Sequence, residues 1–431
     1  MNVTPLEHWI LTRTQPAQKS QEALRAYQFG ELLKALTYAK DKSRFYQTAL
    51  ETIDLSAIRS LKDFEKIPFT TPADIKHNAY DFVCVSSNDI DRIVTLNTSG
   101  TTGDEKRIFF THEDLEATID FFQHGMHCLV DASDKVMVLL PGPAYGSIGD
   151  LLKKALAKSG IECIVHGVLN DVEKTALCIQ KNNITCIVGI PMQVFYLSKL
   201  KPDVFYTHIK KVLLSTDYVP DALVEALSYK GACKVFNHYG MTEMGYGGGV
   251  ECECLGGYHL RENDLYFEIV DPITGALVED GVYGEVVFTT LHRQAMPLIR
   301  YRTGDMARFS TQPCACGTFL RTMEKVLGRI DNKIEINQHE IHLRDMDEIL
   351  LKFGAILDYK LTMSENNALH IQLILTHKSE CEALKKVIVQ QIKERFAFMF
   401  ELTIEAKEDD HSINITNSMI KRKLHHYRQG N

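Results

Sequence analysis

Long apolar runs, long basic runs and the pattern of a secretion signal are all missing from this 431-residue sequence. No apolar stretch reaches the ~20 residues that a helix needs to span a bilayer, so we predict no membrane segment. The formal net charge is −8 and no long run of lysine or arginine occurs, which argues against a nucleic-acid partner. The first residues, MNVTPLEHWILTRT, lack the basic and then apolar segments of a secretion signal.

The cysteines do not form a disulfide framework, because their number is odd, eleven, and their spacing is irregular. We therefore expect a reducing, cytoplasmic environment in which most cysteines are small buried apolar side chains. Repeats and low-complexity tracts are also absent. The composition, 45% hydrophobic and 24% charged, is that of a globular protein, and the length favours two or more domains.

The order of patterns along the chain predicts an α/β protein with several parts. Residues 1–90 show helical periodicity, and residues 93–217 alternate short β-branched runs with helical segments, as in a mostly parallel sheet. Residues 265–310 contain the closely spaced turns of antiparallel strands. A boundary is expected near residues 327–336, and a small α+β unit follows it.

The segment TLNTSGTTGDEKRIFFT, residues 95–111, places glycine and hydroxyl residues before a cation, Lys106. Strand-like residues lie on both sides, and Thr111 with Asp114 forms the capping box of a following helix. The P-loop of nucleotide hydrolases fits poorly, because Lys106 is not followed by Ser or Thr and opens no helix. The loop suits a phosphate ligand, since glycines allow close approach and amides and hydroxyls donate hydrogen bonds. A mobile surface hairpin remains the alternative.

Three further motifs follow the loop in order: NHYGMTEMG at 237–245, RYRTGDMARF at 300–309 and GRIDNKIEI at 328–336. Together with the loop they resemble the adenylate-forming superfamily, which includes acyl-CoA synthetases, luciferases and adenylation domains. The segments PLEHW, GYHLRENDLYFEIVDP and PCACG make the whole chain similar to the phenylacetate–CoA ligase branch, which also contains coenzyme F390 synthetases.

The resemblance implies an α/β fold with a large N-terminal AMP-binding domain, residues 1–328, that has mostly parallel sheets plus an antiparallel subdomain. A small mobile α+β C-terminal lid domain, residues 329–431, follows it. The implied reaction has two steps: a small carboxylic acid, aryl or short-chain, attacks ATP in the presence of Mg²⁺ to give an acyl-adenylate and pyrophosphate. Coenzyme A then displaces AMP and leaves as acyl-CoA. The resemblance is compatible with a homodimer.

The same resemblance assigns catalytic and nucleotide-binding roles to residues of the motifs. Lys106 and the glycine-rich loop surround the β- and γ-phosphates, Thr242 contacts the α-phosphate, and Glu243 holds Mg²⁺, which favours carboxylate oxygens. Tyr239 covers the adenine and Asp305 accepts hydrogen bonds from the ribose hydroxyls. Without the motifs, Tyr239 would be read as a core aromatic and Asp305 as a turn residue. The other nucleotide-binding residues are Ser99, Gly100, Thr101, Thr102, Gly103, Ser215, Thr216, Asp217, His238, Gly240 and Met241.

The end of the chain departs from the family's lid motif. The resemblance gives Arg329 a catalytic contact with ribose or phosphate, and makes Asp331 the hinge about which the lid rotates between the two steps. In the segment NITNSMIKRKLHHYR, Met419 occupies the position of the family's catalytic lysine and cannot donate a charged hydrogen bond. Lys421 or Lys423 substitutes for it if the register differs; otherwise adenylation is slow or the lid serves only the second step. A solvated basic terminus is the alternative.

Two cysteine-rich segments, ECECLGGYH and PCACG, carry the residue types of a structural Zn²⁺ site. Three thiolates and one imidazole make a closed tetrahedral site, and the spacing is that expected of metal-bearing members of the resembled branch. Unrelated buried cysteines are the alternative. The predicted ligands are Cys252, His259, Cys314 and Cys316, with Cys254 as the alternative ligand.

The acyl pocket is assigned to Tyr145 and Gly146, which follow a predicted strand, and to Gly245 and Tyr246, which follow the second motif. Two tyrosines suit an aryl or small apolar acid, although aromatic walls are equally often plain core. The leading interpretation is an acid–CoA ligase. Two alternatives stay open: adenylyl or acyl transfer to another acceptor, as in coenzyme F390 or acyl-protein synthetases, and a nucleotide-binding homologue with impaired adenylation.

Overall fold

The chain forms two compact units in the computed structural model. Unit 1 contains residues 1–133, 143–162 and 236–326, and unit 2 contains residues 134–142, 163–235 and 327–431. Because unit 2 also includes segments before residue 328, the predicted division into residues 1–328 and 329–431 stays a prediction. The residues that the structure describes are 3–16, 18–97, 105–336, 338–363, 368–377, 381–396, 401–409 and 425–426.

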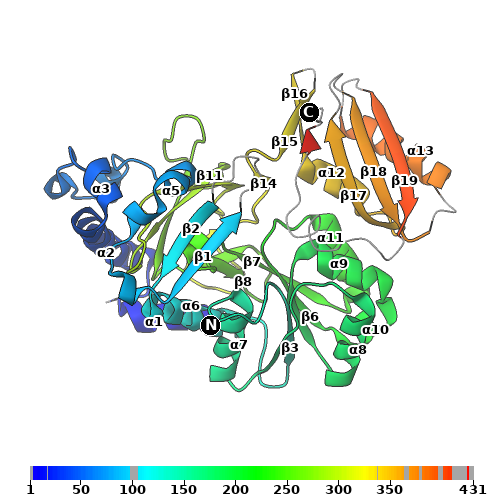
Figure 1. Cartoon of the computed structure of the whole chain (residues 1–431), viewed down its shortest axis with the longest axis horizontal. Helices are drawn as coiled ribbons and strands as arrows, with labels where there is room; N and C mark the ends of the chain where they lie inside the picture. The colour runs from blue at the N-terminus through cyan, green and yellow to red at the C-terminus, as the bar shows by residue number, and fades with distance from the viewer. Residues whose placement is uncertain are drawn as a thin grey trace. The chain divides into compact units, whose positions relative to one another are not determined.

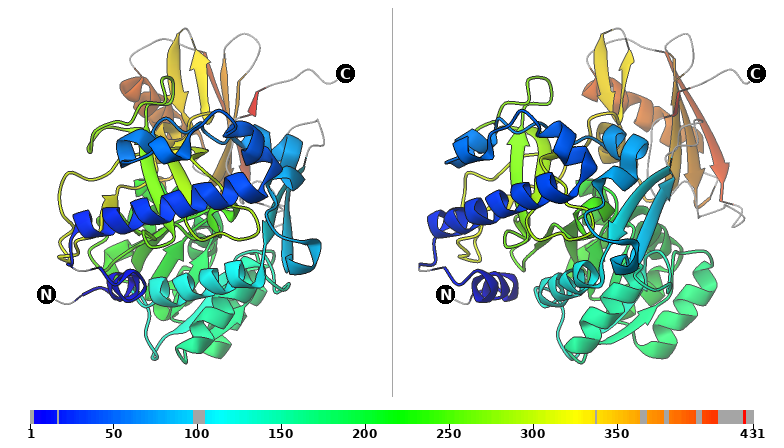
Figure 2. Two further views of the ribbon diagram at one scale, coloured as in Figure 1. Left: turned by 90° about the vertical axis from the view of Figure 1, so that its left-hand side faces the viewer. Right: turned by 60° about the vertical axis from the view of Figure 1, so that its left-hand side comes forward.

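The predicted helical character of the first 90 residues is confirmed in unit 1. Figure 2 shows α2 (Gln21–Lys42) as one long helix beside the antiparallel strands, and Gln28 donates a hydrogen bond to the carbonyl of Glu262 at 2.8 Å. Ser20 caps α2 by accepting from the amide of Ala23, which satisfies one of the free amides at a helix start. The other elements here are α1 (Pro5–Thr14), α3 (Arg44–Ala49), η1 (Leu55–Ala57), α4 (Leu61–Phe64), α5 (Pro72–Asn78), η2 (Ala79–Phe82) and η3 (Ser87–Asp89).

Strands lie on both sides of the glycine-rich loop, as predicted (Figure 1). β1 (Arg92–Asn97) and β2 (Glu105–Phe110) pair antiparallel. The loop itself, residues 98–104 with Ser99 to Gly103, lies outside the described residues. Because Lys106 is the second residue of a strand and starts no helix, the structure excludes the P-loop arrangement.

The predicted capping box after β2 is also present. The Thr111 hydroxyl accepts from the amide of Asp114 and the Asp114 carboxylate accepts from the amide of Thr111, at the start of α6 (His112–Met126). α6 contacts α7 (Ile148–Lys158) within unit 1. The cap fixes where α6 begins, and therefore which of its residues lie near the end of β2.

Unit 1 contains the predicted antiparallel strands. β10 (Leu265–Val270), β11 (Gly284–Thr290) and β12 (Tyr301–Ala307) pair antiparallel in that order. A second set runs in the order β13, β9, β8, β7, and in it Thr322 pairs with His259. This pairing places the second cysteine segment, which leads into β13, beside the first. The bounds are β7 (Lys234–Tyr239), η5 (Thr242–Met244), β8 (Gly249–Glu251), β9 (Tyr258–Leu260) and β13 (Thr322–Met323).

Parallel strands form the earlier part of unit 2, which confirms the α/β prediction. β3 (Lys135–Leu139), β5 (Cys186–Gly189) and β6 (Lys211–Leu214) are parallel neighbours. Every residue of β5 is buried, as expected of a parallel strand covered on both faces. The remaining elements are β4 (Glu162–Val165), α8 (Val172–Asn182), α9 (Pro191–Leu200), α10 (Pro202–His208), α11 (Asp221–Leu227) and η4 (Tyr229–Gly231).

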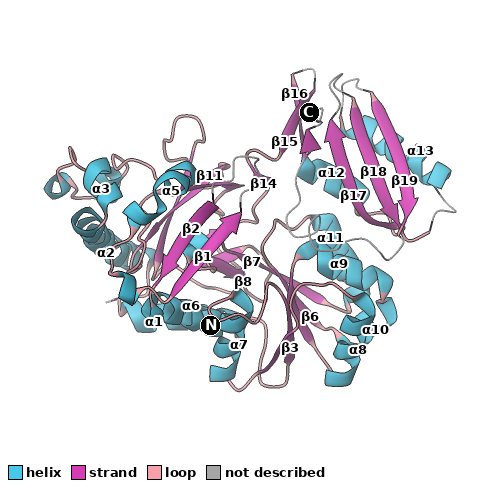
Figure 3. Cartoon of the chain, viewed as in Figure 1, coloured by secondary structure: helices cyan, strands magenta, loops and turns pink. Residues whose placement is uncertain are grey.

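Residues 327–431 contain the predicted small α+β arrangement. The sheet order is β19, β18, β17, β20, and α12 and α13 lie on one face of this sheet (Figure 3). The bounds are β14 (Gly328–Arg329), β15 (Lys333–Ile336), β16 (His339–His342), α12 (Leu343–Leu350), β17 (Ile356–Met363), β18 (Leu369–Leu375), α13 (Cys381–Arg395), β19 (Leu402–Glu408) and β20 (His425–His426). In the part of the chain that the structure describes, no helix has the length and apolar content to cross a bilayer.

Candidate active site and cysteine cluster

A buried ion pair joins two of the predicted catalytic residues of unit 1. Lys106 on β2 pairs with Glu243 in η5, and their side chains are 12% and 7% exposed. Tyr301, the first residue of β12, donates a hydrogen bond to the same Glu243 oxygen at 3.2 Å, and its hydroxyl lies 3.4 Å from Lys106 Nζ. Three segments that are far apart in sequence therefore meet around one carboxylate.

Electrostatics keep the Glu243 carboxylate ionised although it is buried. Burial alone raises its pKa, but the charge and hydrogen bond of Lys106, together with the Tyr301 hydroxyl, bring the pKa below its ordinary value of 4.5. An ionised carboxylate oxygen is the kind of ligand that Mg²⁺ prefers. Glu243 therefore fits the predicted role of magnesium ligand on its own chemistry.

Tyr239 of the motif NHYGMTEMG contacts Asp305 of the motif RYRTGDMARF. The Tyr239 hydroxyl donates to Asp305 Oδ2 at 3.1 Å, and burial followed by the charge of Asp305 raises the Tyr239 pKa well above its usual value. The neighbouring Gly240 has no room for a side chain, because a Cβ there would lie 1.9 Å from the carbonyl oxygen of Tyr246. Burial lowers the pKa of His238 to about 4, so that its imidazole is neutral at pH 7.

The remaining residues of the second motif shape a tight turn. Thr242 opens η5, and the carbonyl of Met241 accepts from the amides of Met244 and Tyr246. This turn directs Glu243 into the buried ion pair described above. Thr242 is partly exposed and lies one residue before that carboxylate.

The other predicted nucleotide-binding and hinge residues belong to unit 2. Ser215 follows β6, and its amide donates to the carbonyl of Gly189 at 3.0 Å. Thr216 has a positive φ of 80°, which is strained for a β-branched residue, and within the described residues its buried hydroxyl has no hydrogen-bond partner. Strain of this kind concentrates at functional sites. The other members of this set are Asp217 in the same turn, Arg329 at the end of β14, and Asp331 in the turn after it.

Three of the four predicted acyl-pocket residues lie together. Tyr246 is buried, stacks on Phe110 with ring centroids 5.5 Å apart, and donates to the carbonyl of Gly146 at 3.2 Å. The carbonyl of Gly245 accepts from the hydroxyl of Thr118 at 3.0 Å. Tyr145 differs, because it is 49% exposed and its hydroxyl donates to Asp91 at 2.5 Å.

The four predicted zinc ligands converge in unit 1. One ligand atom from each of the four side chains lies within 4.8 Å of the others. Cys252 Sγ is 3.6 Å from Cys314 Sγ, and Cys316 Sγ is 3.4 Å from His259 Nε2. Ligands of a tetrahedral Zn²⁺ site stand ~3.7 Å apart when each sulfur is ~2.3 Å from the metal. Cys254 is exposed, and its amide donates to Cys252 Sγ at 3.4 Å.

The sequence interpretation missed Tyr301, which contacts both members of the ion pair. Tyr301 lies on the same strand as the predicted Asp305, but β12 has a register shift between them, so alternation along the strand gave no reliable signal for Tyr301. It also missed Arg293, described below, for which no motif gives a signal.

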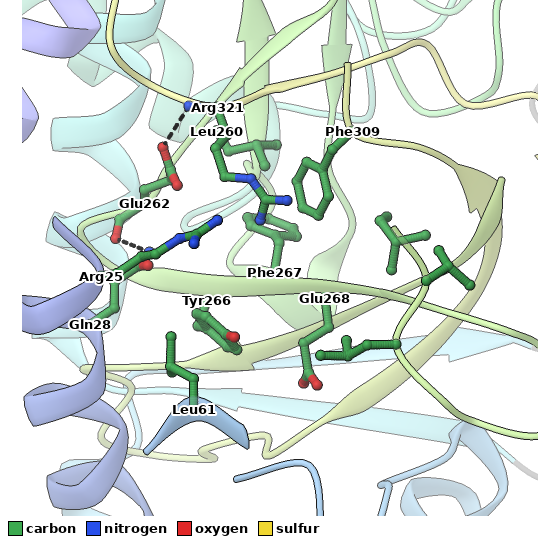
Figure 4. Close-up of a pocket in the computed structure, with 13 residues that line it drawn as sticks. Arg25, Gln28, Leu61, Leu260, Glu262, Tyr266, Phe267, Glu268, Phe309 and Arg321 are labelled. Atoms are coloured by element: carbon green, nitrogen blue, oxygen red, sulfur yellow. Dashed lines mark hydrogen bonds between the residues drawn. The ribbon is translucent and has the colours of Figure 1, made fainter. Parts of the chain in front are cut away.

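A separate cavity of about 210 Å³ lies between α2 and β10 (Figure 4). The Arg321 guanidinium stacks on Phe309 at 3.4 Å from the ring centroid, and its backbone amide donates to Glu262 at 3.2 Å. Burial raises the pKa of Glu262 to about 7, although Arg321 opposes this rise. The protonation of this carboxyl group is therefore expected to change near neutral pH. The group does not contact the predicted catalytic residues.

The raised pKa of Glu262 predicts that the free energy of unfolding depends on pH. Because its folded pKa of about 7 exceeds the usual 4.5, the favourable contribution is fully present below pH 4.5 and is lost as pH rises through 7. A Glu262→Gln variant should match the wild type at pH 4 and be more stable by about 3 kcal/mol at pH 8, measured by urea unfolding. The matched control is Glu279→Gln at an exposed position, which should show no such pH dependence. A variant difference that is equal at both pH values would contradict the assignment.

The comparison with known protein families decides the classification. The profile described as AMP-binding enzyme matches residues 28–292, more than half of the chain. The chain belongs to this family. The motifs that carry the resemblance, and the ion pair and tyrosine–aspartate contact that they form, are thus features of an AMP-binding enzyme.

Curated relatives match this AMP-binding enzyme over nearly its whole length. A phenylacetate–coenzyme A ligase of Thermus thermophilus is 27% identical over 422 residues, covering 94% of this chain and 90% of the relative. One of Pseudomonas putida is 26% identical over 399 residues, covering 87% and 88%. The recognition of the phenylacetate–CoA ligase branch is confirmed.

Solved structures confirm the fold. A 2-hydroxyisobutyryl-CoA ligase in the postadenylation state matches with a TM-score of 0.82 and 18% identity, covering 96% of this chain and 90% of that chain. An anthranilate CoA ligase in complex with anthranoyl-AMP matches with a TM-score of 0.56 and 18% identity, covering 75% and 64%. At these identities the likeness establishes the adenylate-forming fold.

Proposed function

We propose that this AMP-binding enzyme is an AMP-forming acid–CoA ligase that activates an aryl or short-chain carboxylic acid. The acid would attack ATP to give an acyl-adenylate and pyrophosphate, and coenzyme A would then take the acyl group and release AMP. The observation that carries the proposal is the buried Lys106–Glu243 ion pair with the Tyr301 hydroxyl on it. The similarity to phenylacetate–coenzyme A ligases over most of the chain supports the same reaction.

The proposed chemistry of the first step is charge neutralisation around the phosphates. Lys106 and the loop Ser99–Gly103 would bind the departing pyrophosphate, and Thr242 would contact the α-phosphate. Glu243 would hold Mg²⁺, which supplies Lewis-acid stabilisation of phosphate charge. When ATP binds, the Lys106–Glu243 pair would exchange its internal contact for the phosphate and the metal.

The nucleoside would be held by the second pair of residues. Tyr239 would offer a flat apolar surface for adenine. Its hydroxyl donates to Asp305 and would orient that carboxylate toward the ribose hydroxyls. The strained turn at Thr216, with Ser215 and Asp217, is proposed as the other part of the adenine site. Together these groups would position the α-phosphate rather than react with it, which is the main task of such an enzyme.

The second step is proposed to involve residues 329–431 as a lid, with Arg329 contacting the nucleotide and Asp331 as hinge. Met419, which stands where the family has a catalytic lysine, lies outside the described residues. Its side chain carries no charge, so we expect adenylation to be slow relative to thioester formation unless Lys421 or Lys423 takes its place.

The cysteine cluster is proposed as a structural Zn²⁺ site with Cys252, His259, Cys314 and Cys316 as ligands. Zn²⁺ there would join the two cysteine segments and would take no part in the reaction. The thiolates are compatible with the proposed cytoplasmic location, where thiols stay reduced. A homodimer is proposed as the assembly.

Carboxylate-dependent ATP–pyrophosphate exchange tests the proposed function. With a panel of aryl, branched and short linear acids, we expect exchange that requires an acid, and formation of acyl-CoA and AMP after coenzyme A is added. Exchange without thioester would indicate another acceptor. ATP binding without exchange for any acid would contradict the proposal and favour a nucleotide-binding homologue.

A further inference from the structure

Arg293 is a buried cation with an incomplete set of partners. It lies in the segment between β11 and β12, and its side chain is 6% exposed. Its guanidinium lies over the ring of Phe110 at 4.6 Å from the centroid, and Nε is 4.0 Å from Asp114 Oδ1. Nη1 is buried and has no hydrogen-bond partner in the part of the chain that the structure describes.

Asp114, the carboxylate that lies 4.0 Å from Arg293, is already engaged. Asp114 accepts hydrogen bonds from the backbone amides of Thr111, Gln294 and Ala295 at 2.9–3.1 Å. These three bonds hold the cap of α6 and the chain before β12. Because 4.0 Å is beyond hydrogen-bond distance, Asp114 offsets part of the charge of Arg293 but satisfies none of its donors.

Two other buried arginines of unit 1 serve as a comparison, because their guanidinium groups donate to carboxylates and backbone carbonyls. The guanidinium of Arg300 bonds both oxygens of Glu268 and two backbone carbonyls. Arg261 bonds Asp264 at 2.7 Å and the carbonyl of Ala117 at 2.9 Å. Since a buried charged donor without an acceptor is costly, the open donors of Arg293 indicate that a bound molecule supplies the acceptor.

The guanidinium that carries this unpartnered donor lies at the proposed acyl pocket. A Cβ on Gly245 would stand 2.7 Å from Nη2, so glycine is what allows the guanidinium to reach this place. Tyr246 stacks on the same Phe110 ring that Arg293 covers. The position of Arg293 beside Gly245 and Phe110 does not depend on Lys106 or on a lysine of the lid.

A second arginine lies near the same tyrosine. Burial raises the pKa of the Tyr246 phenol to about 12, and the positive charges of Arg92 and Arg293 oppose that rise. The Arg92 side chain passes 3.2 Å from where a Cβ of Gly146 would stand, and its Nε is buried with no hydrogen-bond partner among the described residues. Two cations with open donors thus flank Tyr246.

We propose that Arg293, with Arg92, binds a second carboxylate of the substrate, so that the acid activated is a dicarboxylic acid. This inference rests on the proposed function. The reacting carboxylate would lie toward Glu243 and the α-phosphate, and the remote carboxylate would accept hydrogen bonds from the guanidinium groups, a geometry that suits paired N–H donors. Plain aryl acids would leave both cations unsatisfied and would bind weakly.

Matched acid pairs in the exchange assay test this inference: phenylacetate against 4-carboxyphenylacetate, and butyrate against glutarate. The wild type should favour the dicarboxylate of a pair. Arg293→Met should lower kcat/KM for the dicarboxylate by ~10–100-fold, the range for a charge-assisted hydrogen bond, mainly through KM. The kcat/KM for the monocarboxylate should fall by a smaller factor, so that the preference for the dicarboxylate is lost, and Arg293→Lys should restore part of the preference. Arg321→Met, at the separate cavity of Figure 4, is the control and should leave the preference unchanged.

The outcomes separate this inference from the proposed function. Exchange with monocarboxylates that exceeds exchange with dicarboxylates and is unaffected by Arg293→Met would overturn the inference and leave the acid–CoA ligase intact. An equal rise of the KM for ATP with every acid would overturn it too, because Arg293 would then bind phosphate. A preference for hydroxyl- or keto-bearing acids over dicarboxylates would overturn the proposal that the substrate carries a second carboxylate. Absence of exchange with every acid, mono- or dicarboxylic, would overturn the proposed function and the inference together.

Discussion

Replacing Glu243 with glutamine is expected to lower the rate of carboxylate-dependent ATP–pyrophosphate exchange by ~10²–10³-fold, the range found when one group that stabilises transition-state charge is removed. Glutamine keeps the shape of the side chain but removes the negative charge that the proposed magnesium site requires. The substitution also removes the ion-pair partner of Lys106, so the metal ligand and the Lys106–Glu243 ion pair are lost in one change. The measurement is the exchange rate at saturating ATP and acid.

Loss of the ion pair also lowers stability, which must be separated from loss of catalysis. Breaking a buried pair by removing one partner costs up to ~3–5 kcal/mol, so exchange is to be measured well below the melting temperature of each variant. Glu262→Gln is the matched control, since Glu262 is a fully buried glutamate of the same unit outside the ion pair. Its exchange rate should equal that of the wild type. A Glu243→Gln enzyme that is folded and exchanges within twofold of the wild type would exclude Glu243 as metal ligand.

Replacing Cys316 with serine is expected to remove the proposed Zn²⁺ and to lower the free energy of unfolding by about 4 kcal/mol, a large effect for one substitution because a metal ligand is lost. In a domain of 150–250 residues this corresponds to a fall in melting temperature of ~8–16 °C. The physical reason is that the proposed metal would join the segment before β13 to Cys252 and to His259 on β9, and a serine hydroxyl is a poor replacement for a thiolate. Metal analysis and thermal unfolding measure the two effects.

The chain offers its own control for this experiment. Cys254→Ser changes a cysteine of the same segment that is exposed and lies outside the cluster, so zinc content and melting temperature should stay as in the wild type. A chelator should lower the melting temperature of the wild type and of Cys254→Ser, and leave Cys316→Ser unchanged. Protein purified without chelator that contains no zinc, or an equal effect of both substitutions, would contradict the proposed ligand set.

Much of the fold and part of the site follow from local patterns. Strand character on both sides of the glycine-rich loop, with the capping box at Thr111 and Asp114, predicted the β1–β2 pair and the start of α6 correctly. Cap residues and alternation act over a few residues, so they can be read without knowledge of distant contacts. The ordered motifs also predict that Lys106, Tyr239, Glu243 and Asp305 serve one site. The structure brings Lys106 to Glu243 and Tyr239 to Asp305, and their roles stay a prediction.

The sequence by itself determined the family, the α/β class and the residue types of the cysteine–histidine cluster, because each depends on motifs and spacing within short segments. Only the tertiary structure decided which side chains satisfy one another. Arg293 and Arg300 lie seven positions apart and are the same residue type, yet Arg300 has all its buried donors bonded while Arg293 has open ones. The difference arises from Glu268 on β10 and Asp114 on α6, which reach these arginines only after the sheet and the helix have packed. Hydrogen-bond satisfaction is a property of three-dimensional neighbours, and no local pattern in the chain records it.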